Sequence, residues 1–139
     1  MNGQGRIQAS FARYQLPALV WAGLIFVTSS IPSSAFPDLQ IRKFDKVIHA
    51  GIFLIFCLLV YRALRYQTSS PLLSRHCLGF SLLLTFLYGS LDELHQYFVP
   101  GRSADPFDLL ADTAGGILVV AAIWVLSKIH ADSRGAAGR

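Results

Sequence analysis

Charged residues are scarce in this chain, and their scarcity argues against a soluble fold. Only 14% of the 139 residues are charged, whereas 53% are hydrophobic and the mean hydropathy is +0.48. A typical soluble domain carries about 25% charged residues, spread over its surface. The composition is therefore that of an integral membrane protein.

Other features are also missing, and each absence removes a class of function. The two cysteines, Cys57 and Cys77, form no Cys-x-x-Cys pair, so neither a disulfide framework nor a cysteine metal site is predicted. There is no internal repeat, no low-complexity stretch and no Walker or dinucleotide glycine loop. The pI of about 9.4 comes mainly from cations that flank apolar segments, which indicates contact with anionic lipid rather than nucleic acid.

The chain contains four long apolar runs instead, and these predict four transmembrane helices. Each run is about 15 to 18 residues long, whereas crossing ~30 Å of hydrocarbon at ~1.5 Å per residue takes about 20. Every span must therefore include polar neighbours. The runs are Tyr14 to Ile31, Val47 to Tyr61, His76 to Leu91 and Thr113 to Ser127.

These runs predict an all-α fold, an integral membrane four-helix bundle with short loops. Its domain would cover residues 14–128, between an N-terminal tail (1–13) and a flexible C-terminal tail (129–139). The expected helices are 14–31, 44–63, 75–97 and 106–128.

The distribution of Lys and Arg predicts the orientation of the bundle. Eight of the 12 cations lie in the two tails and in the loop between the second and third helices. The positive-inside bias then puts both termini in the cytoplasm. An alternative is that Arg6, Arg13 and the apolar stretch 16–27 form a cleavable signal peptide, which N-terminal sequencing of the mature protein would test.

The acidic residues cluster near the junctions on the opposite side, beside Lys46, His49, Gln96 and Arg102. A charge at the bilayer centre costs at least ~2.5 to 3.5 kcal/mol unless it finds a partner or water. We therefore expect a polar cup that opens outward. The clustered carboxylates are Asp38, Asp45, Asp92, Glu93, Asp105, Asp108 and Asp112.

Helical spacing assigns these residues to faces. Asp45, Lys46 and His49 share one stripe of the second helix, although Asp45 also suits a first-turn acid and Lys46 an interface anchor. On the third helix Asp92 and Glu93 point about 100° apart. The Glu93-x-x-Gln96 spacing predicts that Glu93 turns inward, and Asp92 is expected at the solvated rim.

The fourth helix has its own pattern of polar and small residues. Asp105 suits the N-cap and Pro106 the first helical position. Asp108 and Asp112, four apart, share one face. Ala111 and Gly115 form a small-xxx-small pair that allows another helix to approach closely.

Taken in order along the chain, these residues resemble the VanZ-like family of small bacterial membrane proteins. The resemblance covers roughly Ser30 to Val125 and implies a polytopic protein of the bacterial cytoplasmic (inner) membrane. The founding member of the family is associated with resistance to teicoplanin. Asp112 departs from the family pattern, where Asn is usual. The matching motifs are Ser30-x-Pro32, Asp45-Lys46-x-x-His49, Glu93-x-x-Gln96, Pro100-Gly101-Arg102, Asp108 and Gly115-Gly116.

The family's polar positions fall on residues that helix depth also selects. The resemblance assigns Lys46, His49, Glu93, Gln96, Arg102 and Asp108, and the depth argument adds Asp112 to the predicted ligand-binding set. No metal ligands are assigned, no cofactor is indicated, and the oligomeric state is not predicted. The expected partners are the lipid bilayer and a lipid-linked or cell-wall component, without nucleic acid.

Three functions remain open. The first is a binding or envelope-modifying protein that changes glycopeptide susceptibility, with Arg102 and Lys46 holding a phosphate. The second is an intramembrane enzyme with His49, Glu93 and Asp108 as catalytic candidates and a divalent cation on Asp108 and Asp112. Proton-coupled transport is the least favoured, because Phe53–Val60 and Gly79–Leu87 contain no charged residue or histidine.

Overall fold

The computed structural model describes residues 10–35 and 44–137, and its regular structure over these residues is entirely helical. Arg6, Asp38, Arg42, Lys43 and Arg139 lie outside the described residues, as does the N-terminal segment of the signal-peptide alternative. The elements are α2 (Leu16–Ser29), the 3-10 turn η1 (Ser33–Ala35), α3 (Asp45–Tyr66), α4 (Pro71–Arg75), α5 (Cys77–Tyr97) and α6 (Pro106–Ala137).

The side-chain distribution is that of a membrane protein. Three helices, α3, α5 and α6, are long and apolar enough to cross a bilayer, and α2 is a shorter apolar helix. Large apolar side chains face outward, for example Leu19 and Leu118, while Ser81, Thr85 and Asp112 are completely buried. Lipid would cover the apolar exterior of such a bundle, so the fold is a membrane helical bundle as expected.

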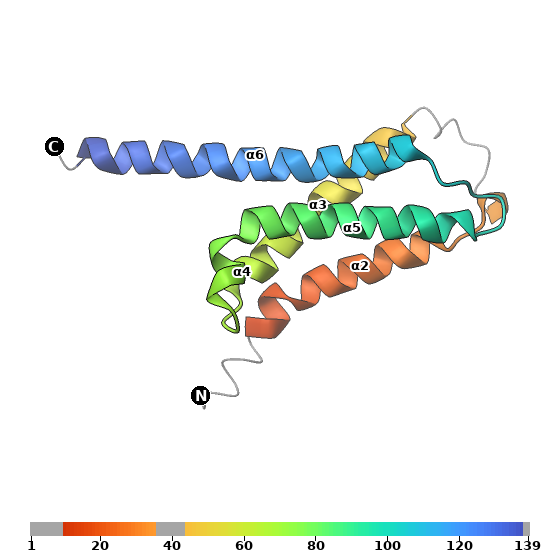
Figure 1. Cartoon of the computed structure of the whole chain (residues 1–139), viewed down its shortest axis with the longest axis horizontal. Coiled ribbons are helices and arrows are strands. Elements are labelled where there is room, and N and C mark those ends of the chain that lie inside the picture. Colours follow the sequence, from red (N-terminus) through yellow and green to blue (C-terminus); the bar gives the residue numbers. More distant parts are fainter. Residues whose placement is uncertain (1–9, 36–43, 138–139) are drawn as a thin grey trace.

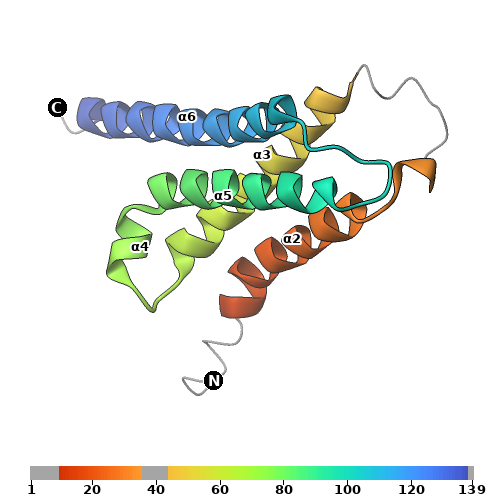
Figure 2. The same ribbon diagram turned by 45° about the vertical axis from the view of Figure 1, so that its right-hand side comes forward.

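The four main helices run alternately up and down (Figure 1). Helix α3 makes its most extensive contact with α6, α5 packs on both, and α2 packs on α3 and α5 from the other side. The start of α2, helix α4 and the end of α6 lie at one end, and the turn between α5 and α6 lies at the other, as the second view also shows (Figure 2). The end with the α5–α6 turn carries most of the acidic residues of the described chain.

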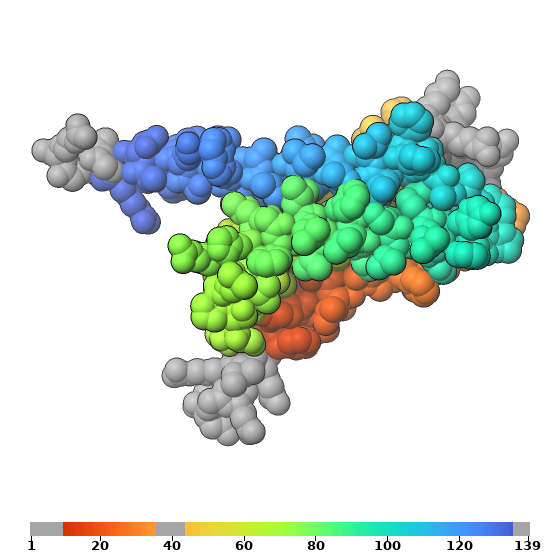
Figure 3. Space-filling model, in the orientation of Figure 1, coloured from red at the N-terminus to blue at the C-terminus, as the bar shows by residue number. Residues whose placement is uncertain are grey.

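Helix α6 is longer than the sequence pattern indicates. It continues to Ala137 instead of ending near residue 128, and the space-filling view shows it extending past the other helices (Figure 3). No proline interrupts the segment after Ser127, and Ser127, His130 and Ser133 bond back to carbonyls of the preceding turn. Local helical bonding is enough to carry the helix beyond the packed region.

The apolar core lies between α2, α3 and α5. Phe53 and Phe56 of α3 pack with Tyr88 of α5, at ring-centroid distances of 6.4 and 4.9 Å. The Tyr88 hydroxyl donates to the Ala22 carbonyl of α2 at 2.6 Å, and the Trp21 indole donates to the Ile52 carbonyl at 3.1 Å. These bonds attach α2 to its neighbours.

A glycine allows α3 and α6 to meet backbone to backbone. A Cβ atom at Gly115 would collide with the Ala50 carbonyl oxygen and would lie 2.9 Å from the Leu54 amide nitrogen. The prediction that the small residues of this helix permit close approach is confirmed at Gly115. Asp112 lies one turn before this contact and His49 beside it, so the close approach sets how near their side chains come.

Candidate functional site

Lys46 joins the start of α3 to the start of α6. Its ammonium group donates to Asp105 Oδ2 at 2.5 Å and to Asp108 Oδ1, and it lies 3.9 Å from Asp45 Oδ2. Asp108 is buried, whereas the Lys46 side chain is 44% exposed. Lys46 therefore neutralises buried charge on α6 and keeps contact with the surroundings.

Asp105 connects three helices. Its Oδ1 accepts the Phe107 amide at 2.9 Å, which confirms the predicted N-cap of α6. Its own amide donates to Glu93 Oε2 of α5 at 2.7 Å, while Lys46 of α3 holds its other oxygen. The hydrogen bond from Lys46, with that from Phe107, holds the pKa of the Asp105 carboxyl below its ordinary value.

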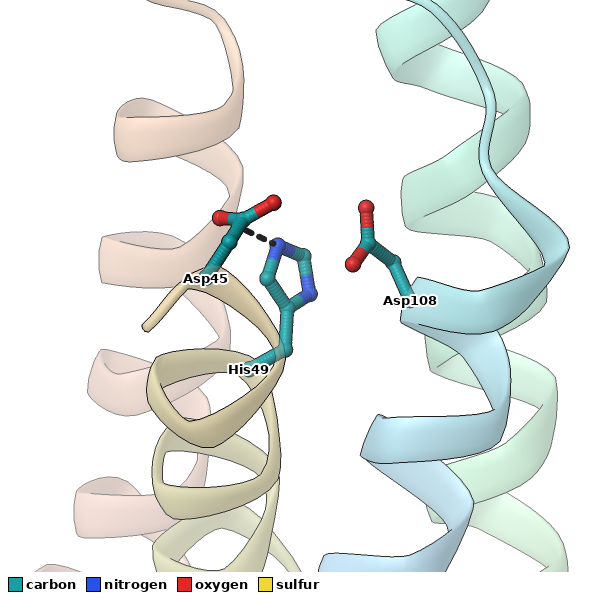
Figure 4. A group of neighbouring side chains, drawn as sticks. All are labelled: Asp45, His49 and Asp108. Atoms are coloured by element: carbon teal, nitrogen blue, oxygen red, sulfur yellow. Dashed lines mark ion pairs between the residues drawn. The ribbon is translucent and has the colours of Figure 1, made fainter. Parts of the chain in front are cut away.

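His49 lies one turn deeper on α3 and faces α6. Its Nδ1 is 3.1 Å from Oδ1 of the completely buried Asp112, and its Nε2 is 4.0 Å from Asp45 Oδ1. Figure 4 shows the imidazole ring between the carboxylates of Asp45, from its own helix, and Asp108, from α6. The ring thus has an acid on each nitrogen side, which fixes its orientation.

Glu93 enters the same region from α5. Its side chain is buried, Oε2 accepts the Asp105 amide, and Oε1 has no hydrogen-bond partner among the described residues. The inward orientation predicted for Glu93 is therefore present. Gly89, one turn earlier on α5, leaves room for the Asp112 carboxylate of α6, since a Cβ at Gly89 would lie 3.1 Å from Asp112 Oδ2.

The expectation for Asp92 is wrong. Asp92 is 6% exposed, as buried as Glu93, and its Oδ2 accepts the Gln96 side-chain amide at 2.9 Å. Helix α5 contacts α2, α3 and α6, so more than one of its faces is covered. Two adjacent acids that point in different directions can then both be buried.

Two of the seven predicted ligand-binding residues have partners elsewhere. Gln96 bonds to Asp92 within α5, and Arg102 Nη2 donates to the Thr28 carbonyl at the end of α2 at 3.2 Å. The remaining five are brought together with Asp45 and Asp105. We call this set the polar cluster: Asp45, Lys46, His49, Glu93, Asp105, Asp108 and Asp112.

Two residues that position the site, Asp105 and Gly89, are not among the predicted ligand-binding residues. The sequence pattern predicts Asp105 as a helix cap and as one of the clustered carboxylates, and its place three residues before Asp108 is a signal that both face one neighbour. Gly89, one turn before Glu93, admits the Asp112 carboxylate. A small residue facing a charged one on another helix cannot be identified from spacing alone.

The chemistry of the polar cluster is that of a negatively charged, partly buried site. Five carboxylates share one lysine and one histidine, and a site of low dielectric disfavours such an excess of negative charge. Two triads each place one nitrogen or oxygen atom per residue within 4.8 Å of the others, which is close enough to surround a cation. They are Asp45–His49–Asp108 and His49–Glu93–Asp112.

Comparison with known proteins bears on most of the chain. A family model described as VanZ/LLP1 matches residues 4–127. The matched range includes the four main helices down to Ser127 and every residue of the polar cluster. The comparisons with curated proteins and with solved structures found no match.

Proposed function

The chain belongs to the VanZ/LLP1 family, and from this premise we propose that it is an envelope protein of the bacterial cytoplasmic membrane. The polar cluster faces outward, binds a lipid-linked or cell-wall component, and so influences susceptibility to glycopeptides such as teicoplanin. The family membership supports a membrane protein of this kind. The polar cluster supports a site within it.

One observation carries the proposal: ionisable side chains from three helices converge at one end of an otherwise apolar bundle. Replacing a buried ion pair with apolar residues is often neutral or stabilising, so such pairs are weak evidence for a purely structural role. Within a membrane, ionisable residues that face the bundle interior commonly mark functional sites. A binding role explains why so many of them lie together.

The proposed ligand is a phosphate-bearing or hydroxyl-rich head group. Lys46 is the exposed cation of the polar cluster and is suited to meet a phosphate, while the carboxylates are suited to accept hydrogen bonds from hydroxyl or amide groups. Two further contacts are proposed: Arg102, in the turn after α5 and beside the end of α2, and Gln96, in the last turn of α5. A head group bound there keeps its acyl chains in the bilayer.

The proposed orientation has both termini in the cytoplasm. Arg62, Arg65, Arg75 and Lys128 belong to the end opposite the polar cluster, where the positive-inside bias puts cations. Reporter fusions at the α4 region and after Gly101 test it. A cytoplasmic signal from the Gly101 fusion would contradict the outward-facing site.

A complementation experiment tests the function. A deletion strain is complemented with wild-type protein, Lys46→Gln, His49→Asn or Asp108→Asn, and teicoplanin susceptibility, envelope lipids and protein accumulation are measured. We expect the three variants to accumulate and to behave like the deletion strain. Asp132→Asn, on the exposed end of α6, is the matched control and should behave like wild type.

Three results would contradict the proposal. The first is a deletion strain with unchanged teicoplanin susceptibility and unchanged envelope lipids. The second is a set of variants that accumulate normally and complement fully, because the polar cluster would then be dispensable. Variants that accumulate poorly, unlike Asp132→Asn, would assign the polar cluster a structural role and would also count against it.

An intramembrane enzyme is the second candidate, and one observation favours it. The buried Asp112 carboxylate holds His49 Nδ1 at 3.1 Å, an arrangement in which a carboxylate orients an imidazole for acid–base catalysis. Glu93, with one carboxylate oxygen lacking a partner among the described residues, supplies a second proton acceptor. Conversion of a lipid precursor by purified protein, lost in His49→Asn, would favour this function over simple binding.

A further inference from the structure

We propose that His49, Glu93 and Asp112 form a binding site for one divalent transition-metal ion. Each residue comes from a different helix, α3, α5 and α6, and their ligand atoms lie within 4.8 Å of one another. Imidazole nitrogen and carboxylate oxygen are ligands that such ions accept. The ion would be bound whether or not an envelope component occupies the polar cluster.

The distances between the proposed ligand atoms fit coordination of one metal ion. Ligands about 2.0 to 2.2 Å from one ion lie roughly 2.8 to 3.6 Å apart at octahedral or tetrahedral angles. His49 Nδ1 and Asp112 Oδ1 are 3.1 Å apart. The Glu93 carboxylate needs only a small side-chain shift to join them, since all three ligand atoms are within 4.8 Å.

Buried carboxylate oxygens without a partner give independent support. Asp112 is completely buried and Glu93 is 6% exposed, yet Asp112 Oδ2 and Glu93 Oε1 have no hydrogen-bond partner among the described residues. A buried unsatisfied polar atom is costly, and one on an anion more so. A divalent cation held by these two carboxylates, through either oxygen of each, would offset their buried charge.

Asp45 orients the histidine for this role. With Nδ1 directed at Asp112, the other nitrogen, Nε2, lies 4.0 Å from the Asp45 carboxylate. Metal-binding histidines commonly direct their second nitrogen at a carboxylate, which fixes the tautomer and strengthens the ligand. At 4.0 Å this is an electrostatic contact and not a hydrogen bond, so Asp45 favours the tautomer with the proton on Nε2, and Nδ1 is the proposed ligand atom.

The competing triad, Asp45, His49 and Asp108 (Figure 4), is less suited to a cation. The Lys46 ammonium bonds directly to Asp108 and lies 3.9 Å from Asp45. It therefore neutralises one of these carboxylates and would repel a divalent ion placed between them. The deeper triad has no lysine or arginine bonded to its carboxylates among the described residues.

The ligand set indicates the class of ion. One imidazole and two carboxylates suit Zn²⁺ or Mn²⁺ better than Cu⁺, which prefers sulfur, or Ca²⁺, which takes six to eight oxygens. Three protein ligands leave at least one coordination position open. Such a position can take a water molecule or an oxygen of a head group.

Metal titration of the whole protein tests the inference. Full-length protein without a histidine tag is purified in detergent, stripped with EDTA and titrated with ZnCl₂ by calorimetry, and bound zinc is measured by mass spectrometry. We expect one ion per chain. Loss of a group that only hydrogen-bonds to a metal ligand weakens metal binding about 10- to 100-fold. Glu93→Gln and Asp112→Asn each remove a ligand, so each should weaken zinc binding about 100-fold or more.

Matched controls identify the site. Asp108→Asn removes a ligand of the competing triad and should weaken zinc binding less than about 10-fold. The double variant His76→Ala/His130→Ala removes two exposed histidines and should leave the stoichiometry unchanged. Co²⁺ in place of Zn²⁺ should give visible d–d bands without the sulfur charge-transfer absorption that binding at Cys57 or Cys77 would produce.

Several results would overturn the inference. One is wild-type protein that binds no zinc. Another is that Glu93→Gln and Asp112→Asn elute as single species and bind zinc like wild type. A third is that Asp108→Asn loses as much zinc affinity as these two variants. If a variant fails to accumulate, the wild type titrated with Co²⁺ decides, because a thiolate charge-transfer band, or a failure to bind cobalt, excludes this ligand set. The outcome is independent of teicoplanin susceptibility, so the two proposals can fail separately.

Discussion

Helix α3 presents two surfaces of opposite character to the rest of the bundle. Toward α2 and α5 it packs Phe53, Phe56 and Val60 against apolar and aromatic neighbours. Toward α6 it presents Lys46 and His49 to carboxylates at one end, and bare backbone to a glycine in the middle. The same helix is therefore held by apolar packing on one side and by charge and close backbone contact on the other.

The difference matters because the surroundings are lipid. Acyl chains are as apolar as leucine, so apolar packing between helices gains van der Waals contact but little transfer free energy. An ion pair has a definite partner, and a glycine contact tolerates no added methyl group. The α6-facing surface should therefore determine the register and rotation of α3, while the α2-facing surface adds less specific packing.

The largest effect is expected at the backbone contact. Gly115→Ala places a methyl group against the Ala50 carbonyl and 2.9 Å from the Leu54 amide, and neither backbone group can rotate away. We expect the free energy of unfolding in mixed micelles to fall by about 3 kcal/mol. Gly51→Ala is the control, since a Cβ there meets nothing within 4 Å. Equal stability of the two variants would show that the contact at Gly115 does not stabilise the fold.

The apolar surface should be less sensitive than a water-soluble core. Phe56→Ala removes a buried ring that packs on Tyr88 at 4.9 Å. In water such a change costs about 3 to 5 kcal/mol, and we expect about 2 kcal/mol in micelles because the transfer contribution is small. Phe86→Ala, whose ring is 42% exposed, should change stability little. If Phe56→Ala lowers the free energy of unfolding more than Gly115→Ala does, the surface of α3 that faces α2 and α5 is the more important one.

Removing the lysine tests the charged end of the α6-facing surface. Lys46→Met leaves Asp105 and Asp108 without their ammonium partner, and because the lysine is 44% exposed the cost should be about 1 kcal/mol. The exposed Lys128→Met should cost less. Adding Asp108→Leu to Lys46→Met should restore most of the lost free energy of unfolding. If it restores none, the lysine stabilises the fold by packing and not by its charge.

The smallest effect concerns the pH dependence of the Lys46–Asp105 pair. The folded-state pKa of Asp105 lies below its ordinary value of 3.8, so the pair stabilises the fold above about pH 4, and this is lost as the pH falls through the lower folded pKa. Asn also caps helices well, so Asp105→Asn removes the charge and keeps the cap. The melting temperature of wild type should exceed that of Asp105→Asn above pH 4, and the gap should close in more acidic buffer; a constant gap would contradict the assignment.

The sequence by itself determined the local features of the protein. Scarce charge and four apolar runs predicted the helical membrane bundle, and Asp105-Pro106 predicted the start of α6. The periodicity of 3.6 residues put Asp108 and Asp112 on one face, where both are buried. These features depend on neighbours within one helix, which is why spacing along the chain reveals them.

Only the tertiary structure decided which groups meet. In the folded chain Lys46 bonds to Asp105 and Asp108, and Arg102 bonds to the Thr28 carbonyl. Asp92 is buried like Glu93. His49, Glu93 and Asp112 come together from three helices. The periodicity of a helix defines its faces but not how far it is rotated or shifted against its neighbours. That placement depends on close contacts such as those at Gly89 and Gly115, where the partner is distant in the chain.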